Sequence, residues 1–160
     1  MLETLERHGV QYVVVGGIAA QIAGAPIVTR DLDITPARDR DNLVRLADAL
    51  RELHAEILIE DKPADIEITL DADTIAGFAS LATSTPHGRL DIVLLPQGTS
   101  GYADLAREAT RELISDEGLA VLVAALADVV RSKAAAGREK DHAQLPILRT
   151  ALEESRRREP

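Results

Sequence analysis

Three aspartates in this chain have the spacing of metal ligands. Asp31 and Asp33 are separated by one residue and open an apolar segment, and Asp91 lies within another. Residues i and i+2 of a strand project from the same face of a sheet. Neighbouring carboxylates repel each other unless a cation lies between them, and Mg²⁺ prefers oxygen ligands of this kind. If the two segments are neighbouring strands, Asp31, Asp33 and Asp91 are predicted to form a divalent-metal site.

A glycine doublet, Gly16-Gly17, follows the apolar run at residues 12–15. The backbone N–H groups of a glycine turn that enters a helix are suited to phosphate, although Gly-Gly also occurs in plain chain reversals. Arg30, directly before the aspartates, either neutralises the acidic cluster or contacts phosphate. Taken together, doublet and aspartates favour a magnesium-dependent enzyme acting on a nucleotide over three aspartates that each end a strand in solvent.

Lys133 interrupts the apolar face of a predicted helix at residues 126–136, because apolar residues lie three, four and seven positions before it. Its amine either extends into solvent from the helix end or reaches an internal anionic ligand. Arg138 and Asp141 follow in a charged turn. Asp141 either caps the next helix or orients Lys133 or Arg138 towards the site. The spacing alone leaves both readings open.

Strands and helices alternate along the chain around these residues. We expect strands at residues 11–15, 32–35, 56–60, 65–70, around 81, 90–95 and 119–123, and helices at 2–8, 18–23, 40–53, 102–109 and about 125–155, the last interrupted at Gly137 and Pro146. This order predicts an α/β or α+β fold with a mixed sheet flanked by helices. We expect one domain at residues 1–160, with a core at about 10–125 and a C-terminal helical part at about 125–155.

Composition restricts the classes of function. The 160 residues include no cysteine, which excludes disulfides, thiol catalysis and cysteine-bound zinc, and the four histidines lack zinc-like spacing. No apolar run approaches a membrane span and the N-terminus has no signal pattern, so we expect a soluble cytoplasmic protein without membrane contact.

The net charge of −9 is unevenly distributed. Residues 1–130 hold 10 Lys and Arg against 22 Asp and Glu, and residues 131–160 hold 8 against 5. Such an acidic body does not favour broad non-specific binding of nucleic acid. A polyanion would approach through a local basic patch, for which the C-terminal segment is the candidate, although an exposed helix end with a frayed tail has the same composition.

Four segments resemble the polymerase-β-type nucleotidyltransferases: VVVGGIAA at 13–20, VTRDLDI at 28–34, GRLDIV at 88–93 and SKAAAGREKD at 132–141. Within that superfamily they look most like the small AbiEii/MenT-like group, which includes toxins of bacterial toxin–antitoxin and phage-defence systems. The resemblance spans about residues 10–148. It implies a mixed-sheet nucleotidyltransferase core with additional C-terminal helices.

The resemblance also implies roles for the residues of the site. The catalytic residues would be Asp31, Asp33, Asp91 and Lys133, of which the three aspartates would bind two Mg²⁺ ions. The nucleotide-binding residues would be Gly16, Gly17, Arg30, Lys133, Arg138 and Asp141. The reaction would be in-line attack of a hydroxyl on the α-phosphate of an NTP, with release of pyrophosphate. Many relatives carry serine where this chain has Gly17, so one hydroxyl contact to phosphate is missing.

The resulting hypothesis is a nucleotidyltransferase that modifies RNA, such as a tRNA 3′ end, as a toxin or defence effector with an antitoxin protein as partner. Because the body is acidic, a protein or a small molecule such as an aminoglycoside stays open as the acceptor. A nucleotide-binding module without transfer activity is a further alternative, against which the three aspartates speak. A purely structural partner in a two-protein complex has no positive signal in the sequence.

Overall fold

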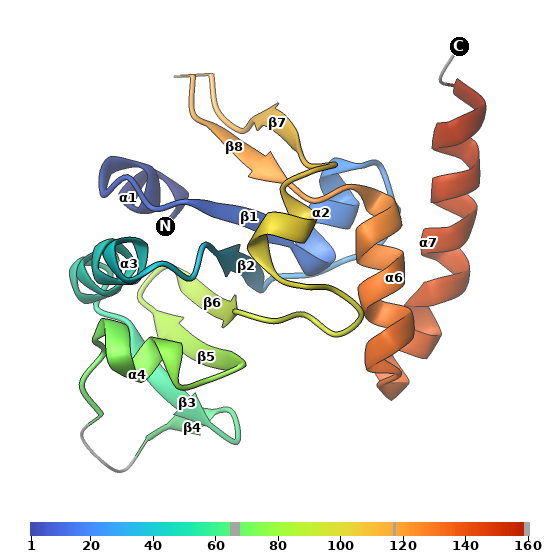
Figure 1. Ribbon diagram of the computed structural model, residues 1–160. Helices are drawn as coiled ribbons and strands as arrows, with labels where there is room; N and C mark the ends of the chain where they lie inside the picture. Colours follow the sequence, from blue (N-terminus) through green and yellow to red (C-terminus); the bar gives the residue numbers. More distant parts are fainter. Residues whose placement is uncertain (65–67, 117, 159–160) are drawn as a thin grey trace.

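Figure 1 shows the computed structural model, which describes residues 1–64, 68–116 and 118–158. Over these residues an eight-stranded mixed sheet is flanked by helices, which confirms the predicted fold class. The elements are α1 (Leu2–Arg7), β1 (Tyr12–Val15), α2 (Gly16–Ile22), β2 (Leu32–Pro36), α3 (Arg40–Glu52), β3 (Glu56–Ile59), β4 (Lys62–Pro63), α4 (Ala72–Ala76), β5 (Ser80–Thr85), β6 (Gly88–Val93), α5 (Tyr102–Leu105), β7 (Thr110–Leu113), β8 (Ala120–Val123), α6 (Leu126–Ala136) and α7 (Glu139–Arg158).

The sheet brings the motifs of the sequence to its centre. The strand order is β4-β3-β5-β6-β2-β1-β8-β7. β2 pairs antiparallel with β1 and parallel with β6, and the register places Asp33 beside Asp91 on one side and Val15 on the other. Because Val15 is followed directly by Gly16, the glycine doublet and two of the aspartates meet at one place in the sheet.

Aliphatic side chains fix these central strands. Val13 and Val14 of β1, Ile34 of β2, and Leu90 and Ile92 of β6 are all fully buried. Burial of one such side chain contributes roughly 1.5–3 kcal/mol. In Figure 1, α1 and α3 lie to the left of the central strands, and α6 and α7 lie to the right. The central strands β1, β2 and β6 therefore lie between two groups of helices and are held by buried aliphatic side chains.

The start of α3 and the end of α6 follow local rules. Asp39 accepts a hydrogen bond of 2.9 Å from the backbone N–H of Asn42, as the sequence predicts for a helix cap. Gly137 ends α6 in the left-handed conformation, with φ of +60°, which glycine adopts without steric cost. The predicted interruption at Gly137 is therefore confirmed.

The predicted interruption at Pro146 is wrong, because α7 continues through it. Pro146 is exposed, so the backbone carbonyl that loses its partner faces water. Leu145 and Leu148 on either side of it are buried and hold the helix in place. Tertiary packing thus outweighs the local cost of the proline.

Other differences lie away from the central strands. The expected strand at 65–70 is not formed at residues 68–70, and 65–67 lie outside the described residues. The expected helix at 102–109 is limited to Tyr102–Leu105, and β7 and α4 form where no element is expected. In the described part of the chain, no helix combines the length and apolarity needed to cross a membrane.

Candidate active site

A cavity of about 870 Å³ lies between the central strands and α6. Its size is that of a site for a small molecule. Its walls bring together most of the residues singled out in the sequence, namely Gly16, Gly17, Arg30, Asp31, Asp33, Asp91, Lys133 and Arg138. Asp141 is not part of the wall and lies behind it, bonded to Lys133 and Arg138.

Both glycines of the doublet are sterically required. Gly16 has φ of +65°, and a Cβ there would overlap the carboxylate of Asp33, with its Cγ only 2.8 Å away. A Cβ on Gly17 would lie 2.7 Å from Cβ and Cγ2 of Thr29 and 3.0 Å from its Oγ1. The structure thus explains why position 17 carries no serine, because Thr29 occupies the space that its side chain would need. Thr29 also lines the cavity.

The carboxylates create an electrostatic strain at the base of the cavity. Burial, and then the neighbouring charges of Asp91 and Asp31, raise the pKa of Asp33 to about 6, although Lys133 and Lys140 act in the opposite direction. A bound cation would relieve this repulsion. The donors therefore suit a hard divalent ion in chemistry and in charge.

The ligand arrangement is not preassembled. Among the described residues, no three acidic, histidine or cysteine side chains are gathered closely enough to hold a metal ion as they stand. Asp91 is instead engaged by Arg89, whose Nε donates a 2.8 Å hydrogen bond to Oδ1 of the carboxylate. The three aspartates thus line one cavity, as the sequence predicts. They do not form a ready-made ligand set, because the carboxylate of Asp91 is bonded to Arg89.

Sequence reasoning did not single out Arg89. Its signal was its position two residues before Asp91 on the same strand, which puts both side chains on one face of the sheet. The other end of its guanidinium donates a 2.6 Å hydrogen bond to Asp61, in the turn between β3 and β4. Both partners favour the charged form and raise the pKa of Arg89 further above its ordinary value.

Lys133 is directed inward by a buried carboxylate. Its side chain is 12% exposed, and its Nζ donates to Asp141 over 3.1 Å. Asp141 is fully buried and also accepts a 2.6 Å hydrogen bond from Nε of Arg138. Burial opposes ionisation of Asp141, but the hydrogen bonds from Arg138 and Lys133 prevail and lower its pKa. Of the two readings of Asp141, the structure shows the orienting one, within the first turn of α7.

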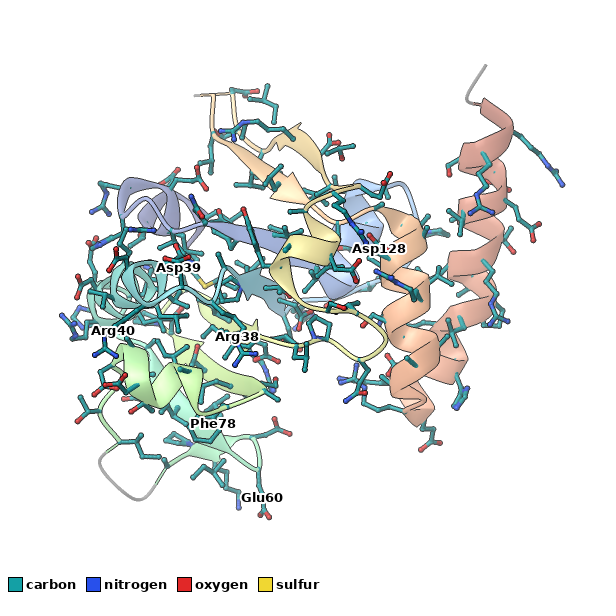
Figure 2. All side chains as sticks on the ribbon, in the orientation of Figure 1. Arg38, Asp39, Arg40, Glu60, Phe78 and Asp128 are labelled. Carbon is teal, nitrogen blue, oxygen red and sulfur yellow. The ribbon has the colours of Figure 1, made fainter. Side chains whose placement is uncertain are left out.

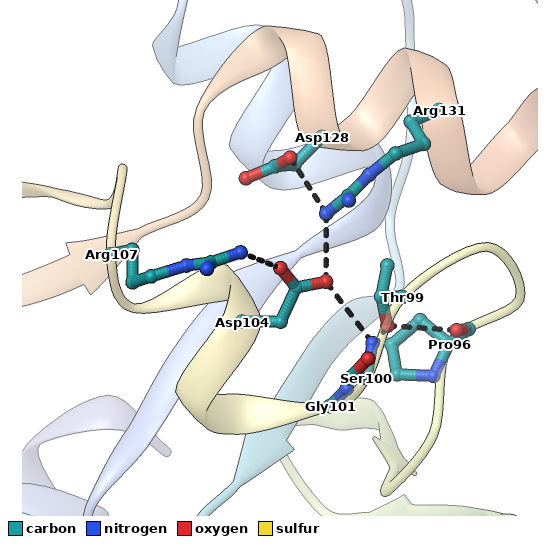
Figure 3. Close-up of polar contacts among 8 residues, drawn as sticks. All are labelled: Pro96, Thr99, Ser100, Gly101, Asp104, Arg107, Asp128 and Arg131. Atoms are coloured by element: carbon teal, nitrogen blue, oxygen red, sulfur yellow. Dashed lines mark hydrogen bonds and ion pairs between the residues drawn. The ribbon is translucent and has the colours of Figure 1, made fainter.

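A second network of ion pairs, partly exposed, anchors α6 itself (Figure 3). Arg131 lies between two carboxylates, at 2.9 Å from Asp104 Oδ2 and 2.9 Å from Asp128 Oδ1. Asp104 also accepts a 3.0 Å hydrogen bond from the backbone N–H of Ser100. The network joins α6 to α5 and to the loop that follows β6. It thereby sets the helix that carries Lys133 relative to the strand that carries Asp91.

Asp128 is a cavity residue that the sequence did not reveal. It lines the wall together with Ser132, one helical turn later. Oδ2 of Asp128 is buried and has no hydrogen-bond partner within the described residues. Burial also raises the pKa of this carboxyl.

No protein-family model matches the chain, and no curated protein is detectably similar to it in sequence. Among solved structures, the chain is similar to the solution structure of the antibiotic-resistance factor ANT(2'')-Ia. The TM-score is 0.57 and the identity 12%, over 94% of this chain and 80% of that chain. At this identity the similarity shows the fold alone, namely a mixed sheet flanked by helices that this chain shares with ANT(2'')-Ia.

Proposed function

We propose that this protein is a nucleotidyltransferase that moves an NMP from an NTP to a hydroxyl acceptor. The observation that carries the proposal is the register that places Asp33 beside Asp91, in a cavity whose wall also contains the bare backbone of the glycine doublet and the inward-directed Lys133. A nucleotide-binding cavity needs no such pair of repelling carboxylates. The fold shared with ANT(2'')-Ia agrees with this proposal.

Each group has a defined part in the proposed reaction. Lys133, oriented by Asp141, presents its ammonium to the triphosphate, and the backbone at Gly16 and Gly17 approaches the phosphates without obstruction by side chains. The acceptor oxygen forms a bond to the α-phosphorus while the bond to the β-phosphate oxygen breaks, and pyrophosphate leaves. Two Mg²⁺ ions on Asp31, Asp33 and Asp91 would lower the pKa of the hydroxyl and offset charge on the entering and leaving oxygens.

For the acceptor we propose an RNA hydroxyl, such as a tRNA 3′ end. Three exposed cations, Arg30, Arg138 and Lys140, lie at the cavity wall and provide a local basic rim on an otherwise acidic protein. Such a rim suits the phosphates that flank a terminal nucleotide. This acceptor fits the AbiEii/MenT-like resemblance, and with it a role as a toxin or defence effector that an antitoxin protein restrains.

The test is transfer of label from each α-³²P-labelled NTP, with Mg²⁺, to purified tRNA, total RNA, aminoglycosides or cell lysate. An Asp31→Ala/Asp33→Ala variant is the control. We expect label on RNA that is lost in the control. Label on an aminoglycoside or a protein would overturn the proposed RNA acceptor but support nucleotidyl transfer as the reaction. NTP binding without transfer to any acceptor would overturn the proposal in favour of a silent binding module.

A further inference from the structure

Three charged side chains, Asp61, Arg89 and Asp91, form consecutive ion pairs from the protein surface to the cavity. Asp91 is one of the proposed catalytic carboxylates. Asp61 lies in the turn between β3 and β4 and is 79% exposed. Arg89 on β6 bridges it to Asp91, at 2.6 Å from Asp61 and 2.8 Å from Asp91. Figure 2 labels Glu60, which lies next to Asp61 at the tip of this hairpin. Glu60 and Asp61 both have positive φ, as expected for a two-residue hairpin turn between paired strands.

The two oxygens of Asp91 are in different environments. Oδ1 is occupied by Nε–H of Arg89, whereas Oδ2 accepts no hydrogen bond within the described residues. A guanidinium is a planar donor with fixed directions, so a contact through Nε sets the orientation of the carboxylate as well as its charge. Asp61 accepts a hydrogen bond from the far end of the guanidinium, so Arg89 is contacted by a carboxylate at both ends.

Stability alone is a weak reason for this arrangement. One partner is highly exposed and Arg89 is 30% exposed, and ion pairs of this kind contribute little to folding. The Arg40–Asp73 pair has the same 2.6 Å contact, but it joins α3 to α4 away from the cavity. The Arg40–Asp73 pair is therefore a suitable control for Arg89–Asp61, because it has the same contact distance but no link to a carboxylate of the cavity.

We propose that Arg89 is a positioning residue for Asp91, and that Asp61 in turn positions Arg89. Arg89 turns Asp91 so that Oδ2 is left for the reacting groups in the cavity, and it lowers the net negative charge where Asp31, Asp33 and Asp91 gather. This inference rests on the proposed nucleotidyl transfer. It adds two residues outside the cavity wall to the machinery of the site.

The experiment compares Arg89→Gln, Arg89→Lys and Asp61→Asn with the control variants Arg40→Gln and Asp73→Asn. Two quantities are measured: kcat and KM for the NTP in the transfer assay, and the Kd of Mn²⁺ for the metal-free protein. The second measurement needs no turnover. Melting temperatures show whether each variant folds as the wild type does.

We expect Arg89→Gln to lower kcat by roughly 10–100-fold, the usual effect of losing a group that orients a metal ligand, while KM for the NTP stays within twofold. The same variant should bind Mn²⁺ more tightly, because a positive charge next to the carboxylates is gone. Arg89→Lys should fall between wild type and Arg89→Gln, and Asp61→Asn should lower kcat less than Arg89→Gln. Both control variants should match the wild type.

A double variant tests whether Arg89 acts through Asp91. In an Asp91→Asn background, Arg89→Gln should change the Kd of Mn²⁺ by less than twofold. An unchanged kcat in Arg89→Gln, or a loss matched by the Arg40→Gln control, would overturn the inference. If the wild type transfers no nucleotide, the proposed function fails, and an Mn²⁺ affinity unaffected by Arg89→Gln separately refutes the action of Arg89 on the carboxylates.

Discussion

Gly17 and Thr29 compete for one small volume at the cavity wall. The Cβ that any other residue would bring to position 17 lies 2.7 Å from the Thr29 side chain, within the distance at which something must move. The glycine at position 17, where the family resemblance leads us to expect serine, is therefore matched by the Thr29 side chain that fills the adjoining space. The hydroxyl nearest to that position now belongs to Thr29.

Gly17→Ser should lower the free energy of unfolding by about 1–3 kcal/mol, the range for inserting atoms into filled space. Adding Thr29→Ala should recover most of this loss, so that the two effects are not additive. Gly77→Ser is the matched control, since a Cβ there meets nothing nearer than 3.4 Å. Urea unfolding of the wild type, Gly17→Ser, Thr29→Ala and the double variant measures the cycle, and additive losses would contradict the shared volume.

Asp33 makes the stability of the metal-free protein depend on pH. Its folded-state pKa of about 6 lies above the ordinary 3.8, so the folded protein binds this proton more tightly than the unfolded chain does. Stability should therefore fall as pH rises from about 4 to about 7, by about 3 kcal/mol in total. The difference between wild type and Asp33→Asn isolates this contribution in thermal unfolding with EDTA.

Mg²⁺ should offset the loss of stability that ionisation of Asp33 causes, because the ion binds the ionised carboxylates. We expect Mg²⁺ to raise the melting temperature more at pH 8 than at pH 5, and to have little effect on Asp33→Asn. An equal Mg²⁺ effect at both pH values would contradict a site built on Asp33. The measurement is a thermal shift at matched ionic strength.

At the scale of elements, Asp141 joins α6 to α7 directly behind the cavity. It is fully buried, and it receives Lys133 from one helix and Arg138 from the turn between them. Removing one member of a buried ion pair leaves the other charge without its partner. The position of Lys133 at the cavity thus depends on a residue that never enters it.

Asp141→Asn should lower the free energy of unfolding by roughly 3 kcal/mol and weaken NTP binding, because Lys133 loses its fixed partner. The matched control is Asp48→Asn, which removes an exposed pair with Arg51 at the same i,i+3 spacing. That control should change stability by less than about 1 kcal/mol. Titration of a fluorescent NTP analogue measures binding, and an unchanged affinity would show that Asp141 serves the fold alone.

At the scale of the whole molecule, the net charge of −9 restricts how a polyanion can approach. The exposed cations at the cavity wall, Arg30, Arg138 and Lys140, are few, so an RNA acceptor would make a small number of phosphate contacts. The acidic remainder of the surface repels the rest of the nucleic acid. Recognition would therefore be confined to the end of the strand.

The salt dependence of RNA binding tests this picture. With about three phosphate contacts, log K should fall with log salt concentration at a slope of roughly −2, and Arg30→Gln should reduce the slope by about 0.7. Arg45→Gln, which removes a charge that bonds to Gly9 and Asn42 instead of lining the cavity, is the control. A much steeper slope would indicate a broad binding face and contradict end recognition.

Local sequence patterns predicted the strands of the fold more completely than they predicted the residues of the site. Short apolar runs bounded by glycine or proline predicted β1, β2 and β6, because burial in the middle of a sheet selects such runs. Pro146 misled because its exposure is not a property of the local sequence. Arg89 was passed over although its spacing from Asp91 is local, and its contact with Asp61 depends on the sheet order β3-β5-β6, which joins segments far apart in the chain.

The sequence by itself determined which side chains could do chemistry and on which face of each strand they lie, because the periods of strands and helices are local properties of the chain. The tertiary structure decided that Asp33 lies beside Asp91, that Thr29 fills the space at Gly17, that Asp141 directs Lys133 and that Arg89 holds Asp91. Register and helix packing are set by apolar burial between segments far apart in the chain. No spacing within one segment encodes them.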